Sequence, residues 1–286
     1  MTARGSDVVP DARARRAPGA VPARAGADAS GALRAVRPAW PARVAWGALG
    51  LAAILFLWWL GTEALAAPGG LARRFGPTAS FASLYALLAD SDLPWHILVS
   101  LRRVLVGLAL AMAIGIPLGL AVGSWRRLEA ALSPAMQFLR MISPLSWMPI
   151  AVMVFGVGDD PVYFLLTFAA VWPILLNTAS GVQQLDARWL LLARSVSATR
   201  RETLLTVVLP GVLGHVLTGV RLAIGILWIV LVPCEMLGVS AGMGYFILDT
   251  RDRLAYSELM AMVLMIGVLG FMLDAAARGL YRLWRG

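Results

Sequence analysis

The residue types that usually carry out chemistry are scarce in this chain. All 25 basic residues are arginine, so the lysine of a phosphate-binding P-loop and the lysine of a Schiff-base enzyme are both missing. Cys234 is the single cysteine and cannot form an internal disulfide. His96 and His215 are isolated in sequence and offer no metal-ligand spacing. No nucleophile with a base and an orienting group stands out, which argues against an intramembrane enzyme.

A second set of residues draws interest because polar side chains interrupt strongly apolar stretches. An ionisable group at membrane depth is costly and suggests a function. Glu235 could act in gating or contact a substrate, or it could pair with an arginine at the membrane interface. Ser143, Trp147 and Asn177 could line a pathway beside proline breaks, or could satisfy neighbouring backbone groups. The predicted pathway residues are Arg140, Ser143, Pro144, Trp147, Asn177 and Glu235.

The apolar stretches that must position these residues are long enough to cross a bilayer. The chain has 286 residues, 59% of them hydrophobic and 14% charged, and about 20 apolar residues in a helix span the hydrocarbon core. We therefore predict an all-α membrane protein with six transmembrane helices. Their predicted ranges are 44–65, 105–122, 128–157, 161–180, 217–237 and 259–280. Three prolines interrupt the third range and predict a bent span, while Gly115 and Gly119 in the second predict close helix packing.

The distribution of arginine predicts which side of the membrane each connection faces. Residues 1–43 carry eight arginines and three aspartates without an apolar stripe, which predicts a disordered cytoplasmic tail. A cleaved signal peptide is the competing interpretation, but the next apolar run is longer than a signal core. The basic turn at 123–127 and the C-terminus predict that both termini are cytoplasmic. The formal charge of +9 fits this bias and requires no nucleic acid as a partner. Residues 66–95 are predicted to be external, although Arg73 and Arg74 depart from the rule.

The largest polar interruption in the second half covers residues 186–210. Trp189, Leu192, Ala193 and Val196 follow helical spacing and predict one apolar helix face, with Asp186 as a possible N-cap. The Thr-Arg-Arg-Glu sequence from Thr199 is a capping-box pattern ahead of a second apolar run. This stretch therefore predicts two short helices with a bend at 197–199, placed between the fourth and fifth spans.

The same stretch resembles the cytoplasmic coupling loop of ABC-importer permeases. The family pattern is Glu-Ala-Ala, a Gly four residues later, and then a branched apolar residue, a spacer and Leu-Pro. The register places this chain's residues at those positions in the order Leu191, Leu192, Ala193, Ser197, Val207, Leu209 and Pro210. The family's acidic residue and its glycine are thus absent. Residues 143–161, 172–182 and 218–247 are similar to permeases of nitrate, sulfonate, taurine and bicarbonate importers.

That resemblance implies a permease domain over 44–286 in a multi-pass protein of the bacterial inner membrane. It implies a second permease copy, as a homodimer, two ATP-binding subunits that carry ATP and Mg, and a periplasmic substrate-binding protein. The chain itself would then be a transport subunit without a cofactor, moving a small anion such as nitrate, a sulfonate or taurine. Arg140 and Arg221 could contact that anion, or could extend from the ends of their spans toward lipid headgroups.

The coupling loop would dock on the ATPase through Trp189, Leu192 and Val196 as apolar anchors. Its charged rim would be Arg194, Arg200 and Arg201, and Pro210 would mark the joint to the fifth span. A solvated connecting loop is the plainer interpretation of this segment. A secondary transporter or channel without an ATPase is the alternative function, because broken spans and intramembrane charge occur there too.

Overall fold

The described residues of this computed structural model, 40–67 and 69–285, contain helices and connections and no strand. The all-α prediction is confirmed for that part of the chain. The predicted N-terminal tail, 1–43, lies outside it except for its last four residues, which are helical. In chain order the elements are α1 (Trp40–Trp59), η2 (Leu60–Ala64), α2 (Leu71–Arg74), α3 (Pro77–Asp90), α4 (Leu93–Ser124), α5 (Arg126–Met141), η3 (Pro144–Trp147), α6 (Met148–Phe155), α7 (Asp159–Gln183), α8 (Ala187–Ser195), α9 (Arg200–Thr203), η4 (Leu204–Val208), α10 (Leu209–Glu235), α11 (Met243–Asp252) and α12 (Tyr256–Arg285).

The chain divides into two units, and the boundary lies within α1, between Ala52 and Ala53. The first contains the beginning of α1, an uninterrupted apolar helix in its described part. The second contains every later element, and its packing positions the candidate site.

Five helical stretches are long and apolar enough to cross a membrane. They cover Ala45–Ala64, Leu93–Ser124, Asp159–Gln183, Arg200–Glu235 and Tyr256–Gly279. A sixth crossing results if the bent pair Arg126–Met141 and Pro144–Phe155 counts as one span. The described spans thus agree with the six predicted ranges in order, with one of them broken as the prolines indicated.

The break in the third predicted range lies between α5 and the short helices η3 and α6. The two halves meet at an angle of 86°. Ile142 is extended, Ser143 is not helical (φ −58°, ψ 130°), and Pro144 begins η3 directly afterwards. Because proline disfavours helical backbone in the residue before it, the chain turns at Ser143. Pro134, by contrast, lies within α5 without ending it.

The core of the second unit is built by α4, α7 and α10, which pack along much of their lengths. Gly107, Gly115 and Gly119 of α4 face side chains of α7 at distances that leave no room for a Cβ atom or only a tight fit. On α10, Gly219 meets the backbone of α7 in the same way. Small residues allow helix backbones to approach closely, so the prediction that Gly115 and Gly119 are packing residues is confirmed.

Helix α4 begins earlier than predicted, at Leu93 rather than at 105. The predicted range begins two residues after Arg103. In the structure Arg103 is buried and paired with carboxylates of other helices. Because its charge is compensated inside the bundle, the helix continues through this position.

The helix that ends in α10 also begins earlier than predicted, because α9, η4 and α10 form one continuous stretch of 36 residues. At about 1.5 Å per residue it measures about 54 Å, well beyond the ~30 Å hydrocarbon core. Pro210 is the second residue of α10 but lies inside this continuous stretch, where proline removes one backbone donor and favours a bend. The π-helical turn η4 precedes it, so the predicted joint contains a widened turn and no break.

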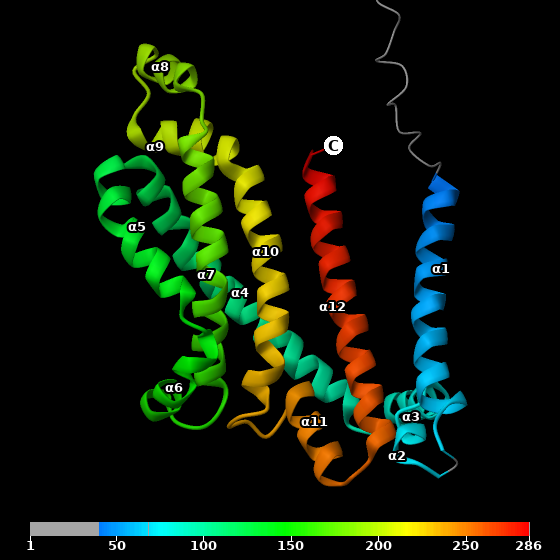
Figure 1. Ribbon diagram of the computed structural model, residues 1–286. Coiled ribbons are helices and arrows are strands. Elements are labelled where there is room, and N and C mark those ends of the chain that lie inside the picture. The colour runs from blue at the N-terminus through cyan, green and yellow to red at the C-terminus, as the bar shows by residue number, and fades with distance from the viewer. Residues whose placement is uncertain (1–39, 68, 286) are drawn as a thin grey trace, which may run out of the picture. The chain divides into compact units, whose positions relative to one another are not determined.

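Figure 1 shows α8 and α9 at one end of the second unit and α11 at the other. Helix α7 leads into α8, and η4 leads back into α10. The 186–210 segment is therefore attached to the core by two of its three central helices.

Candidate functional site

The 186–210 segment has the local structure that its sequence predicts. An Asp186 carboxylate oxygen accepts a hydrogen bond from the Arg188 backbone N–H at 2.9 Å and caps α8. Thr199 Oγ1 accepts from the Glu202 N–H at 3.2 Å, and Glu202 Oε2 accepts from the Thr199 N–H at 2.7 Å. These reciprocal bonds are the capping box that begins α9.

The bend between α8 and α9 depends on the backbone of Ser197. This residue has φ of 55°, in the left-handed region that glycine adopts most easily. Its N–H donates to Arg194 O, and the Ala198 N–H donates to Ala193 O, both at 3.0 Å. This pair of bonds is the Schellman motif that ends many helices. The position at which related loops are expected to carry glycine thus has a backbone conformation that favours glycine.

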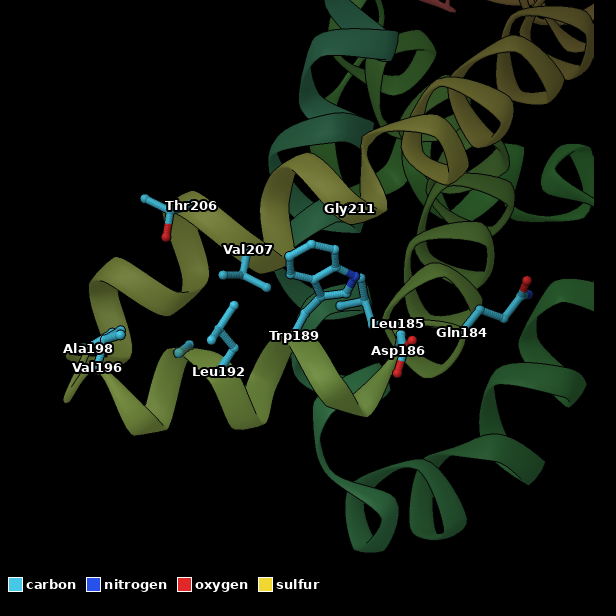
Figure 2. Close-up of a pocket in the computed structure, with 11 residues that line it drawn as sticks. Gln184, Leu185, Asp186, Trp189, Leu192, Val196, Ala198, Thr206, Val207 and Gly211 are labelled. Carbon is cyan, nitrogen blue, oxygen red and sulfur yellow. The ribbon is translucent and has the colours of Figure 1, made fainter.

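A groove of 620 Å³ lies between α8 and the chain that returns to α10. Figure 2 shows Trp189 and Leu192 pointing from α8 toward Val207 and Gly211. Ala193 forms the buried base of α8, whereas Trp189, Leu192 and Val196 remain exposed. The predicted apolar face therefore exists, but three of its four side chains do not pack into the chain's own core.

The other predicted docking residues surround this groove or lie beside it. Leu191 is exposed but does not line the groove. The arginines of the predicted rim are exposed as well. The exposed set comprises Leu191, Arg194, Ser197, Arg200, Arg201, Leu209 and Pro210. The structure thus places all of the predicted docking residues on one short segment, and their role in docking remains a prediction.

The predicted pathway residues lie in three separate places. Arg140, Ser143, Pro144 and Trp147 surround the bend between α5 and α6, with Arg140 and Ser143 exposed. Asn177 lies on α7, and its side-chain amide donates to Pro173 O at 2.8 Å, which matches the alternative that it satisfies backbone. Glu235 ends α10. The role of these residues in a transport pathway stays a prediction.

Glu235 belongs to a buried ionic cluster that joins three helices. Its Oε1 lies 2.8 Å from Arg103 Nη1 of α4, and the Ser100 hydroxyl donates to its carboxylate at 2.7 to 2.8 Å. Arg103 Nη2 also lies 2.6 Å from Asp159 Oδ1 at the start of α7. Glu235 has no exposed surface in this chain. The structure therefore matches the arginine-pairing alternative, and any direct substrate contact would require this cluster to open.

Arg103 is the member of this cluster that the sequence does not single out. The signal was present, because a carboxylate inside an apolar stretch needs a cation, and Arg102 and Arg103 begin another such stretch. Sequence alone could not select between the two arginines. Arg221 Nε lies 3.6 Å from Asp274 Oδ1 of α12 in a half-exposed pair. Both of its predicted roles, as an anion contact or as an anchor to lipid headgroups, stay predictions.

The described residues offer no site for a resident metal ion. Among residues 40–67 and 69–285, no group of three His, Cys, Asp or Glu side chains lies close enough to hold one. Cys234 is buried, next to Glu235.

The helical bundle, with its broken span and a two-helix segment at one end, defines a multi-pass membrane protein. Comparison with known proteins gives its family. Residues 115–285 match the family described as the inner membrane component of binding-protein-dependent transport systems. The chain belongs to this family. It is therefore a permease component of the ABC transporter class.

Several characterised relatives share much of their length with this chain. The bicarbonate transport permease CmpB of Synechococcus elongatus is 36% identical, over 82% of this chain and 86% of the relative. The nitrate import permease NrtB of Leptolyngbya laminosa is 36% identical, over 65% and 67%. The taurine transport permease TauC of Escherichia coli is 31% identical, over 68% and 70%. These relatives favour the permease function over a secondary transporter or channel.

A solved structure shares the fold at much lower identity. An inward-facing form of the MetNI methionine ABC transporter contains a chain that matches with a TM-score of 0.55 at 17% identity. The match covers 67% of this chain and 95% of that one. It supports the helical architecture described above.

Proposed function

We propose that this chain is the membrane-spanning subunit of an ATP-driven importer of a small oxyanion in the bacterial inner membrane, with both termini in the cytoplasm. The observation that carries the proposal is the groove beside α8, where Trp189, Leu192 and Val196 stay exposed. Burying side chains of this size is worth about 1.5–3 kcal/mol each. A contiguous apolar surface outside the bilayer calls for a protein partner.

The partner proposed for this groove is an ATPase subunit. This chain has no lysine, so it has no P-loop, and the ATP and Mg that power transport belong to another polypeptide. Short amphipathic helices commonly bind partners by placing an apolar face against an apolar surface. Arg194, Arg200 and Arg201 are exposed nearby and would meet acidic groups at the rim of the interface.

The proposed coupling runs through continuous helix. Residues from Arg200 to Glu235 form one stretch that begins next to the groove and ends in the buried ionic cluster. A displacement of α8 and α9 by the ATPase would therefore move the near end of α10. The π-helical turn η4 and Pro210 lie where that stretch leaves the groove, which makes them the expected place for bending.

The complete assembly proposed here has two copies of this permease, two ATP-binding subunits and a periplasmic substrate-binding protein. The family description, which names binding-protein-dependent transport, supports the last partner. The cargo class follows from what the relatives' substrates share. Bicarbonate, nitrate and the sulfonate group of taurine each present negatively charged oxygen atoms. Arg140 and the Ser143 hydroxyl, both exposed beside the bent span, are the candidate contacts for such a group.

The docking proposal is tested by replacing one groove leucine with aspartate. Leu192→Asp places a charge in the groove and is expected to abolish co-purification of the ATPase from membranes. Leu254→Asp is the matched control: Leu254 is 61% exposed and Leu192 is 55% exposed. Leu254 lies two residues beyond α11, which Figure 1 shows at the opposite end of the second unit. Full retention of the ATPase by Leu192→Asp would refute docking at this groove.

The cargo proposal needs a separate measurement. Uptake of labelled bicarbonate, nitrate and taurine is compared in cells with and without the transporter, and each anion is tested as a competitor of the others. We expect one or more of these oxyanions to be accumulated, and uptake to be lost in Leu192→Asp. Accumulation of a cationic or uncharged solute in place of all three would overturn the oxyanion assignment.

A further inference from the structure

Helix α11 begins without a capping side chain of its own. Its N-cap is Gly242, with φ of 122°, and the first residues of the helix are Met243 and Gly244. The first N–H groups of a helix have no acceptor within the helix. Their hydrogen-bond acceptors must therefore come from other parts of the chain, and those acceptors hold this end of α11 in place.

Three N–H groups at this end, those of Gly242, Met243 and Gly244, donate to side chains of other helices. Gly242 N–H donates to His96 Nδ1 at 3.0 Å, and Met243 N–H donates to Ser100 Oγ at 2.9 Å. Gly244 N–H donates to Glu235 Oε2 at 3.0 Å. Helix α11 is therefore capped by α4 and α10, two helices of the core.

Position 242 requires glycine because the side chains of Arg103 and Glu235 lie very close to its backbone. A Cβ atom at this position would lie 2.5 Å from Arg103 Nη1 and 2.6 Å from Glu235 Oε1. A Cβ atom at Gly244 would collide with the Val232 carbonyl oxygen. The backbone of α11 therefore reaches the carboxylate and the guanidinium directly.

Seen from the carboxylate, these contacts are those of a bound oxyanion. Glu235 accepts from Arg103 Nη1 at 2.8 Å, from the Ser100 hydroxyl, and from the first turn of α11. Guanidinium groups, hydroxyls and helix N-termini are the groups with which proteins bind small oxyanions. Three further donors of Arg103 go to Asp159 and to Ala241 O, so its orientation is fixed from both sides.

We propose that Ser100, Arg103 and the N-terminus of α11 form an oxyanion-binding site whose occupant is the chain's own Glu235. In this arrangement Glu235 acts as a tethered ligand. It positions α11 against the core by binding to it, as a free carboxylate would. The site is distinct from the proposed ATPase groove and does not depend on the proposed cargo.

We expect that the Glu235 side chain can be removed by mutation and that a free carboxylate can then bind in its place. Glu235→Ala removes four heavy atoms, and formate and acetate, with three and four heavy atoms, match the space. The permease is purified in nanodiscs and unfolded by heat with sodium formate or with sodium chloride at equal ionic strength. We expect Glu235→Ala to unfold at a lower temperature than wild type. Formate at about 100 mM is expected to recover a few degrees, as ligand binding to the folded state requires.

Two variants provide the controls. Glu235→Gln keeps the space filled with an amide, so formate should not change its unfolding temperature. The double variant Arg103→Met with Glu235→Ala lacks the guanidinium, so it should not respond either. An ordinary structural ion pair would be lost equally in Glu235→Ala, but formate would have no more effect than chloride. That result would overturn the proposal.

A second measurement applies if Glu235→Ala does not fold. Glu235→Asp keeps the charge but withdraws the carboxylate by one methylene, so it can no longer reach all of its donors. Hydrogen exchange at the amides of 242–244 is expected to accelerate at least tenfold, with exchange in α7 unchanged. Unchanged exchange at 242–244 would show that Glu235 does not hold the start of α11.

Discussion

Arg103 Nη1 lies 2.8 Å from Glu235 Oε1 and joins α4 to α10 across 132 residues of sequence. The two side chains are 3% and 0% exposed. A buried ion pair is expensive to break by removing one partner, because the other charge remains buried. This single contact, with Asp159 beside it, fixes the relation of three helices at the end of the second unit that carries α11.

Arg103→Ala should therefore destabilise the protein strongly, by about 3–5 kcal/mol. The neighbouring Arg102 is the matched control, since its side chain is 65% exposed and lies 3.8 Å from Asp159. Arg102→Ala should cost no more than about 1 kcal/mol. Thermal unfolding of both variants in the same nanodiscs measures the difference. Equal effects would mean that the buried pair does not stabilise the fold.

How much the sequence could predict depends on the range of the interaction involved. The caps at Asp186 and Thr199 were predictable, because each bond joins residues two or three positions apart. The apolar face of α8 was predictable for the same reason. The ranges of the spans were predicted in order because hydropathy is a local property of the sequence.

Long-range pairing could not be predicted from one sequence. Nothing near Arg103 in the sequence shows that its partners lie at Asp159 and Glu235, so the predicted span begins only after it, at 105. The capping of α11 by His96 and Ser100 was invisible for the same reason. The predicted pathway residues lie in three separate places. Residue spacing along single helices could not show this, because it does not give the relative positions of residues on different helices.

Gly119 of α4 sets how closely α4 and α7 approach. A Cβ atom there would lie 2.6 Å from the Leu175 carbonyl oxygen and 2.7 Å from Thr178 Cβ. The first of these is backbone and cannot move without shifting α7. Gly119→Ala should therefore force the helices apart and destabilise the fold by about 1–3 kcal/mol.

Gly267 of α12 is the control for this substitution, because a Cβ atom there meets nothing within 4 Å in the described part of the chain. Gly267→Ala should be neutral or slightly stabilising, since alanine favours a helix over glycine. The thermal unfolding temperatures of the two variants are compared. A higher unfolding temperature for Gly119→Ala than for Gly267→Ala would contradict the packing argument.

Two serines near the end of α8 should respond in opposite directions to glycine. Ser197 has φ of 55°, which costs a residue with a Cβ atom about 1–2 kcal/mol. Glycine removes that cost but orders more backbone on folding, so Ser197→Gly should stabilise the bend by about 0.5–1 kcal/mol. Ser195 lies in the last turn of α8, and its hydroxyl donates to Leu192 O at 2.7 Å. Ser195→Gly should therefore destabilise α8 by about 0.5–1 kcal/mol.

Hydrogen exchange over residues 187–203 measures both effects, because the change is local and global unfolding would dilute it. Ser197→Gly should slow exchange of the α8 amides roughly two- to fivefold, and Ser195→Gly should speed it by a similar factor. Faster exchange in both variants would show that the left-handed turn at Ser197 carries no strain. Slower exchange in Ser197→Gly alone would show that the bend gains order from the residue expected there in related loops.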